Sequence, residues 1–162
     1  MKKSIKVIVA LLLVCALFAG CGVLGDQERT CEDLTITIPG HFLDMSDQDY
    51  AKGMNFLYGF NDIAVVGIRE TKESLAFYDA DLTLEEYGAL VMQGNGLDGD
   101  MELKEGLYTF EYEASNAGQT FTYLGAVFEG EEAFWIVQAY CLSDEYEQHQ
   151  ADMMKWLKSV KV

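Results

Sequence analysis

The two histidines are the first residues to test for catalytic chemistry, because this 162-residue chain contains only His41 and His149. Nucleophilic catalysis needs a nucleophile with a base beside it. Neither histidine lies near a Gly-x-Ser-x-Gly turn, and His149 falls within an amphipathic segment, where a surface histidine is the simpler interpretation. The sequence therefore predicts no catalytic residue, and we expect a protein that is not an enzyme.

The acidic residues offer one candidate metal site. Zinc and copper sites need clustered histidine and cysteine, and the sequence shows no such cluster. Calcium takes several carboxylate and carbonyl oxygens, and the glycine-rich stretch 95–102 contains Asp98, Asp100 and Glu102. This stretch lacks the spacing of an EF-hand, so an ordinary acidic turn is the simpler interpretation. We predict no metal and no other cofactor.

The N-terminus has the layout of a secretory signal. Three lysines in the first six residues precede an apolar run over residues 7–19, which is too short to span a bilayer as a helix. The run ends in Leu17-Phe18-Ala19-Gly20-Cys21, which resembles the bacterial lipobox, except that Phe18 stands where leucine is usual. We expect residues 1–20 to be a signal peptide and Cys21 to carry fatty acids, palmitate among them, that anchor the chain to the cell membrane outside the cytoplasm. The alternative is cleavage nearby and a soluble secreted protein.

The remaining cysteines suggest a disulfide. Cys15 leaves with the signal peptide and Cys21 is acylated, so Cys31 and Cys141 are left as a pair. Export places the pair in a compartment where disulfides persist. We predict a Cys31–Cys141 bridge, with two buried free thiols as the alternative.

Composition limits the architecture and the partners. Residues 21–162 are enough for one domain, and we expect a polar tether over residues 21–32 followed by a single domain over residues 33–162. This mature chain has eight basic and 27 acidic residues, a formal net charge of −19. Nucleic-acid binding relies on lysine and arginine to neutralise phosphates, so we expect no nucleic-acid partner.

The pattern of apolar residues predicts an α+β fold. Alternating or continuous apolar stretches predict six strands, at residues 33–38, 54–60, 63–70, 107–114, 119–128 and 133–142. A capping box of Thr83 and Glu86 opens one helix, which ends at Gly94-Asn95-Gly96. Ser143 is expected to cap a second helix, whose apolar stripe runs from Tyr146 to Val160. The order β-β-β-α-β-β-β-α indicates an antiparallel sheet of about six strands with two packed helices.

Several segments of the sequence resemble one superfamily. They are Thr35-Ile36-Thr37-Ile38-Pro39-Gly40 with Phe42, Val66-Gly67-Ile68-Arg69-Glu70, Thr83-Leu84-Glu85-Glu86-Tyr87, Phe134-Trp135-Ile136-Val137 and Trp156-Leu157-Lys158-Ser159-Val160. Together they resemble the fold shared by the photosystem protein PsbP, the Ran-binding nuclear import factor and bacterial DcrB-like lipoproteins. The resemblance covers residues 33–162 and implies an assembly or interaction role by fold-level analogy. No binding residue of those families maps onto this sequence.

These observations lead to three hypotheses. The first is a non-enzymatic, membrane-tethered module that binds a protein or other component of the cell envelope. The second is a small-ligand-binding protein or an enzyme whose site is assembled from distant strands, and the third is a purely structural envelope lipoprotein. Strand aromatics could line a ligand surface or form the core: Tyr108, Phe110, Tyr112, Phe121, Tyr123, Phe134 and Trp135.

Overall fold

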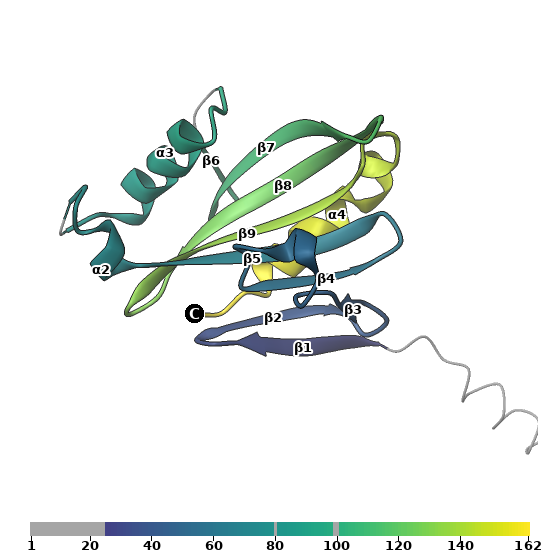
Figure 1. Cartoon of the computed structure of the whole chain (residues 1–162), viewed down its shortest axis with the longest axis horizontal. Helices are drawn as coiled ribbons and strands as arrows, with labels where there is room; N and C mark the ends of the chain where they lie inside the picture. Colours follow the sequence, from purple (N-terminus) through teal and green to yellow (C-terminus); the bar gives the residue numbers. More distant parts are fainter. Residues whose placement is uncertain (1–24, 80, 99–100) are drawn as a thin grey trace, which may run out of the picture.

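The computed structural model describes residues 25–79, 81–98 and 101–162. They form an α+β fold with a seven-stranded antiparallel sheet, in the order β3-β4-β5-β9-β8-β7-β6, and a separate hairpin of β1 and β2 (Figure 1). The strands are β1 Asp26–Cys31, β2 Leu34–Pro39, β3 Leu43–Asp44, β4 Phe56–Phe60, β5 Ile63–Thr71, β6 Glu102–Lys104, β7 Leu107–Asn116, β8 Gln119–Glu129 and β9 Ala133–Leu142. The helices are η1 Asp49–Ala51, α2 Lys72–Leu75, α3 Leu84–Gly94, η2 Ser143–Glu145 and α4 Tyr146–Lys158.

The expected fold class is confirmed, and each expected strand is present close to its expected bounds. The large sheet has seven strands rather than six, because the short edge strands β3 and β6 join five of the expected strands while the sixth, β2, pairs with β1 instead. The predicted signal peptide, residues 1–20, and Cys21 lie outside the described residues. None of the helices described is long and apolar enough to cross a membrane.

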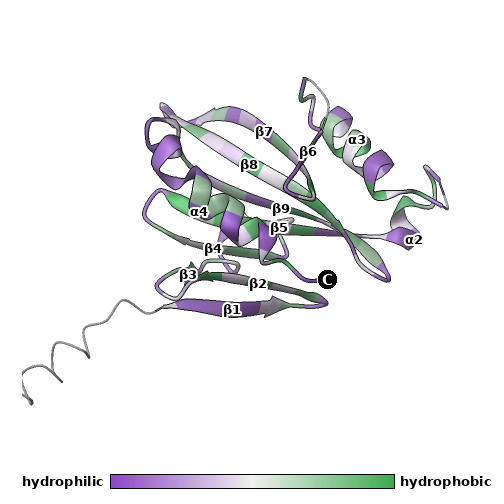
Figure 2. Ribbon diagram, turned by 180° about the vertical axis from the view of Figure 1, so that it is seen from behind, coloured by the Kyte–Doolittle hydropathy of each residue, from purple (hydrophilic) through white to green (hydrophobic). Residues whose placement is uncertain are grey.

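The N-terminal region differs from the expectation in two ways. Within the expected tether, residues 26–31 form strand β1, which pairs with β2 from Asp26 opposite Pro39 to Cys31 opposite Leu34. The prediction failed there because β1 is largely hydrophilic (Figure 2), so the alternation that indicates a half-buried strand is weak. In addition, β2 belongs to this hairpin and not to the large sheet.

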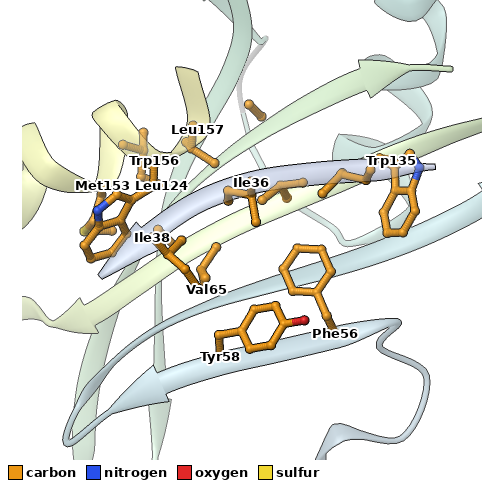
Figure 3. Close-up of a cluster of buried hydrophobic side chains, with 14 of the residues drawn as sticks. Ile36, Ile38, Phe56, Tyr58, Val65, Leu124, Trp135, Met153, Trp156 and Leu157 are labelled. Atoms are coloured by element: carbon orange, nitrogen blue, oxygen red, sulfur yellow. The ribbon is translucent and has the colours of Figure 1, made fainter. Parts of the chain in front are cut away.

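One side of the large sheet, here called the packed face, is covered by α4 and the β1–β2 hairpin (Figures 1 and 2). Leu34, Ile36 and Ile38 alternate along β2 and are fully buried against it. The close-up in Figure 3 shows Ile36 and Ile38 of β2 in one cluster with side chains of the sheet and of α4, with Trp135 at one end and Trp156 at the other. The largest hydrophobic cluster of the described chain therefore lies on this side.

The other side, here called the open face, is covered only in patches. Helices α2 and α3 pack Leu75, Tyr87 and Val91 over one end of it, and the segment around η1 covers the other end. Strand β9 lies between β5 and β8, and residues 133–137 are buried on both sides. It is therefore a central strand that is covered on both faces.

The two long helices begin differently from one another. Thr83 and Glu86 form the predicted capping box, in which each side chain accepts a hydrogen bond from the other residue's backbone N–H. Ser143 does not cap the last helix, because its hydroxyl accepts a hydrogen bond from the buried Thr122 at 2.8 Å and the chain passes through η2 first. The prediction for Ser143 was therefore wrong, and the reason is a cross-strand partner that local sequence does not reveal.

Candidate functional site

A cavity of about 460 Å³ lies on the open face, beneath α3. Its floor is formed by β5 and β9, and its walls are formed by α3 and by the end of α2 with the loop that follows. Most of the lining is apolar, with a carboxylate, two phenols and two amides among the aliphatic side chains. The lining residues are Ile68, Glu70, Leu75, Tyr78, Tyr87, Leu90, Val91, Gln93, Gly94, Asn95 and Ile136.

Local structure explains why these residues meet. Ile68 and Glu70 are two apart on β5, so both point to the open face. Tyr87, Leu90 and Val91 are three or four apart on α3 and form one helix face. The helix stops at the cavity because the Asn95 side-chain amide donates to the Val91 carbonyl at 2.7 Å.

Tyr87 and Glu70 form the central polar contact of the cavity. The Tyr87 ring is 1% exposed and stacks on Phe134 with ring centroids 4.5 Å apart. Its hydroxyl donates to Glu70 Oε2 at 2.6 Å. Burial and, secondarily, this hydrogen bond raise the pKa of Tyr87 far above its ordinary value. The phenol is therefore a fixed donor that holds the Glu70 carboxylate against the cavity.

Two exposed aromatic residues, here called the aromatic rim, border the cavity. The Phe77 side chain is 92% exposed and Tyr78 is 66% exposed, with ring centroids 5.8 Å apart in an edge-to-face arrangement. Tyr78 and Leu75 also line the cavity, so the rim and the cavity form one continuous feature. Large apolar side chains this exposed are a common mark of interaction surfaces.

The charges around the aromatic rim are mainly negative. Exposed carboxylates flank the rim and begin α3, at Glu73, Asp79, Asp81 and Glu85. By contrast, every lysine of the described chain lies within 4.0 Å of a carboxylate; these are Lys52, Lys72, Lys104, Lys155, Lys158 and Lys161. Residues 25–79, 81–98 and 101–162 therefore offer no unpaired lysine to the carboxylates at this end.

The histidines lie away from the cavity. His41 contacts the rings of Phe42 and Phe60 edge to face, at centroid distances of 5.3 and 5.2 Å. His149 lies on α4, 3.9 Å from the Glu145 carboxylate. Neither histidine is among the residues that line the cavity beneath α3.

The predicted Cys31–Cys141 bridge is not formed in the structure, where both thiols are free. The Cys31 thiol donates to the Asn55 carbonyl at 3.4 Å, whereas the Cys141 sulfur contacts Met153 Sδ at 3.9 Å beneath α4. Burial raises the pKa of both thiols, that of Cys141 to about 11. Each sulfur has its own partner in a different part of the core, which corresponds to the alternative of two free thiols.

The acidic stretch 95–102 is described in part, because Gly99 and Asp100 lie outside the described residues. Asp98 and Glu102 line a separate cavity of about 340 Å³ together with Lys104, whose ammonium pairs with Glu102 at 2.7 Å. No group of three or more histidine, cysteine or acidic side chains suited to a metal occurs within the described ranges. Calcium binding by this stretch remains an untested hypothesis.

The strand aromatics divide between core and surface. Phe110, Phe134 and Trp135 are buried. Tyr112, Tyr123 and Tyr140 are half-buried and lie side by side across β7, β8 and β9, with neighbouring ring centroids 4.7 and 4.9 Å apart. They form a shelf on the open face beyond α3.

Sequence reasoning missed the residues that define the cavity. Glu70 appeared only as the last residue of a predicted strand, and Tyr87 only within the segment 83–87 of the superfamily resemblance. The loop over residues 71–80 contains Phe77-Tyr78 directly before Asp79. An aromatic pair inside a polar loop is the one signal that could have indicated this site.

Comparisons with known proteins identify the fold. The chain is similar to the solution structure of cyanobacterial PsbP (CyanoP) from Synechocystis sp. PCC 6803, with 12% identity and a TM-score of 0.52 over 88% of this chain and 95% of that one. A Bacteroides thetaiotaomicron protein gives 6% identity and a TM-score of 0.44 over 86% of this chain and 48% of that one. No protein-family model and no curated protein sequence matches the chain. The chain therefore has an α+β fold similar to that of PsbP.

Proposed function

We propose that this protein is a lipoprotein, anchored outside the cytoplasm through Cys21, whose α2–α3 end binds a protein component of the cell envelope without catalysing a reaction. The proposal combines the lipobox-like sequence before Cys21 with an exposed surface of the folded domain. A finer relationship, to DcrB-like lipoproteins, is part of the same proposal.

The observation that carries the proposal is the position of the aromatic rim. Helices α2 and α3 lie at the opposite end of the domain from the start of β1, and the two views in Figures 1 and 2 agree on this. Four residues lie between Cys21 and Asp26, so the five steps from Cα to Cα reach at most about 18 Å. An anchor at Cys21 would hold the β1 end at the bilayer and leave Phe77 and Tyr78 facing outward.

Charge favours a polypeptide partner over a membrane surface or nucleic acid. The net charge of −19 for residues 21–162 repels both phosphate and anionic headgroups. Protein interfaces are enriched in aromatic side chains at their centres and are polar at their edges. Phe77 and Tyr78, surrounded by carboxylates, have that composition.

The polar groups of the cavity support binding better than catalysis. Its lining contains no histidine, serine or cysteine, so a nucleophile with an adjacent base is missing from it. Tyr87 is held protonated and already donates to Glu70. This pair can orient a ligand, but a second group able to accept and return a proton is not beside it.

A small-ligand-binding protein is the second candidate, and the volume of the cavity favours it. A volume of about 460 Å³ falls within the range of about 300–1,000 Å³ for small-molecule sites. A small ligand would fill the cavity and leave Phe77 uncovered. A protein partner would therefore contact the outer side of the aromatic rim, whereas a small ligand in the cavity would not.

Crosslinking in intact cells tests the proposal. A photoreactive amino acid at position 77 is compared with one at Leu43, which is 61% exposed on β3 near the start of β1. We expect position 77 to give a defined polypeptide adduct and position 43 to give none of the same mass. Adducts at neither position, or the same adducts at both, would contradict the proposal.

Mass spectrometry of the mature N-terminus tests the anchor separately. We expect a chain that begins at an acylated Cys21, and we expect Cys21→Ser to release the protein from the membrane fraction. A native chain that still carries residues 1–20, or an unmodified Cys21, would exclude the lipoprotein assignment.

A further inference from the structure

We infer that the cavity beneath α3 receives a lysine side chain from a basic segment of the partner polypeptide, with the lysine ammonium placed on the Glu70 carboxylate. This inference rests on the proposed function, because it names the chemistry that the α2–α3 end recognises. It concerns Glu70 and its surroundings, which the proposed function does not require.

The walls of the cavity suit the stem of a lysine. Ile68, Leu90 and Ile136 present aliphatic groups, and Leu75 closes one side. Lysine buries its methylene chain along apolar surface while its ammonium seeks an oxygen. A purely apolar side chain would fill the same walls, but it would bury Glu70 without a counter-charge, and burying an unpaired charge is costly.

The hydrogen bonding of Glu70 favours lysine over arginine. Tyr87 already donates to Glu70 Oε2, so a guanidinium that engaged both carboxylate oxygens would have to share Oε2 with this buried hydroxyl. An ammonium is a compact charge with three donors and needs only one carboxylate oxygen. Asn95 also lines the cavity, and its amide nitrogen is bonded to the Val91 carbonyl, which leaves the amide oxygen as a second acceptor.

The described chain supplies no cation of its own to Glu70. All six of its lysines are paired with other carboxylates, and Arg69 on the packed face is bonded to Glu32 and Asp33 at 3.1 and 3.2 Å. The other described arginine, Arg29, lies on β1 over the Tyr58 ring, also on the packed side. The nearest lysine in sequence, Lys72, pairs with Glu129 at 2.7 Å and lies over the Phe134 ring. A cation that reaches Glu70 would therefore come from another molecule.

The surroundings of the cavity favour a polypeptide over a free alkylamine. A free amine would fill the cavity and leave Phe77, with its 92% exposed ring, without a contact. Residues that flank a lysine in a peptide would cover this ring. Further basic residues of the same segment would face the exposed carboxylates at Glu73, Asp79 and Asp81.

Methyl NMR on the full chain in detergent micelles tests the inference directly. The probes are the tripeptide amide Ac-Leu-Lys-Leu-NH₂, the same peptide with norleucine in place of lysine, and n-butylamine. We expect the lysine peptide to shift the methyl signals of Ile68 and Ile136 and to bind at least about tenfold more tightly than the norleucine peptide. Equal binding of the two peptides would overturn the inference without the need for any variant.

A matched pair of variants assigns the effect to one carboxylate. Glu70→Gln removes the charge but keeps an oxygen that can accept from Tyr87, and Glu147→Gln removes an exposed charge on α4, outside the cavity lining and away from the aromatic rim. We expect Glu70→Gln to lower the affinity for the lysine peptide to within about twofold of that for the norleucine peptide. We expect Glu147→Gln to change it by less than about twofold, because a surface charge is screened by solvent.

The n-butylamine result shows whether the amine that binds must belong to a polypeptide. The crosslink and the peptide affinities together show which of the two proposals has failed. If n-butylamine binds as tightly as the lysine peptide, the cavity is a site for free amines and the polypeptide assignment is wrong. If Glu70→Gln binds the lysine peptide normally while the crosslink from position 77 is retained, the inference fails and the proposed function stands. If the crosslink is lost while lysine discrimination persists, the proposed function fails instead.

Discussion

The two faces of the large sheet are built from similar residues but are covered to different extents. On the packed face, α4 and the hairpin bury a continuous cluster in which Trp135, Leu157 and Met153 are completely inaccessible. Hydrogen bonds also join its elements, since the Trp135 indole N–H donates to Asp33 at 3.0 Å and the Thr37 N–H donates to Ser159 Oγ at 2.9 Å. On the open face, α3 leaves a cavity and the three stacked tyrosines remain half-exposed. The packed face can therefore supply most of the stability, which leaves the open face free to carry a binding site.

Replacing one aromatic residue on each face by alanine should give the largest difference in unfolding free energy between the two faces. Trp135→Ala removes a fully buried ring and leaves a void beside Phe56, so we expect a loss of about 3–5 kcal/mol in the free energy of unfolding. Tyr123→Ala on the open face removes a half-buried ring, and we expect a loss of about 1–2 kcal/mol. Urea unfolding measures both values. Equal losses would contradict the contrast between the faces.

Two glycines allow a second comparison. A methyl group added at Gly67 would lie 2.0 Å from the Phe56 ring on the packed face, and one added at Gly125 would lie 2.3 Å from the Phe110 ring on the open face. Phe56 is enclosed by Tyr58 and Trp135, whereas Phe110 borders a cavity into which its ring can move. We expect Gly67→Ala to cost about 3 kcal/mol and Gly125→Ala about 1 kcal/mol in unfolding free energy. A larger cost at Gly125 would show that the open face is as rigid as the packed one.

The sequence was informative about the packed face and much less informative about the open one. Alternation in β2 and the apolar stripe of α4 follow directly from burial on the packed face. On the open face, the start of α3 was predicted because the capping box at Thr83 is encoded within four residues. The hairpin strand β1 was missed because it is held by its pairing with β2, not by an apolar face of its own. The cavity was missed for a related reason: Glu70 and Tyr87 are far apart in sequence and meet only because α3 crosses the sheet. Sites assembled from tertiary contacts leave no local pattern.

The free energy of unfolding is expected to depend on pH through Asp33, which lies in the turn of the β1–β2 hairpin on the packed face. Although partial burial opposes the effect, hydrogen bonds from Arg69 and Trp135 hold the pKa of Asp33 below its ordinary value. Because the pKa of Asp33 is lower in the folded state, its carboxylate stabilises the fold fully above the unfolded pKa of about 3.9. This stabilisation is lost as the pH falls through the folded pKa. We expect Asp33→Asn to cost about 1 kcal/mol at pH 7, since the carboxylate is partly exposed, and we expect this difference to shrink below about pH 4.

Urea unfolding at several pH values checks this behaviour. The exposed Asp47→Asn serves as the control and should track the wild type throughout. A cost of Asp33→Asn that stays constant down to the lowest pH would mean that the Asp33 charge contributes nothing to the attachment of the hairpin.

The smallest effect on stability is expected at the aromatic rim, where the functional effect should be greatest. Phe77→Ala removes a ring that is 92% exposed, so the free energy of unfolding should change by less than about 0.5 kcal/mol. The variant should nevertheless lose the in-cell adduct formed from a photoreactive group at the neighbouring position 78, whereas Leu43→Ala should keep it. A natural chain gains no stability from leaving a phenylalanine in water, so a variant that stays folded but no longer contacts its partner would explain why the residue is there. If Phe77→Ala unfolds the domain, the ring belongs to the fold, and the contrast between a stabilising face and a binding face would have to be abandoned.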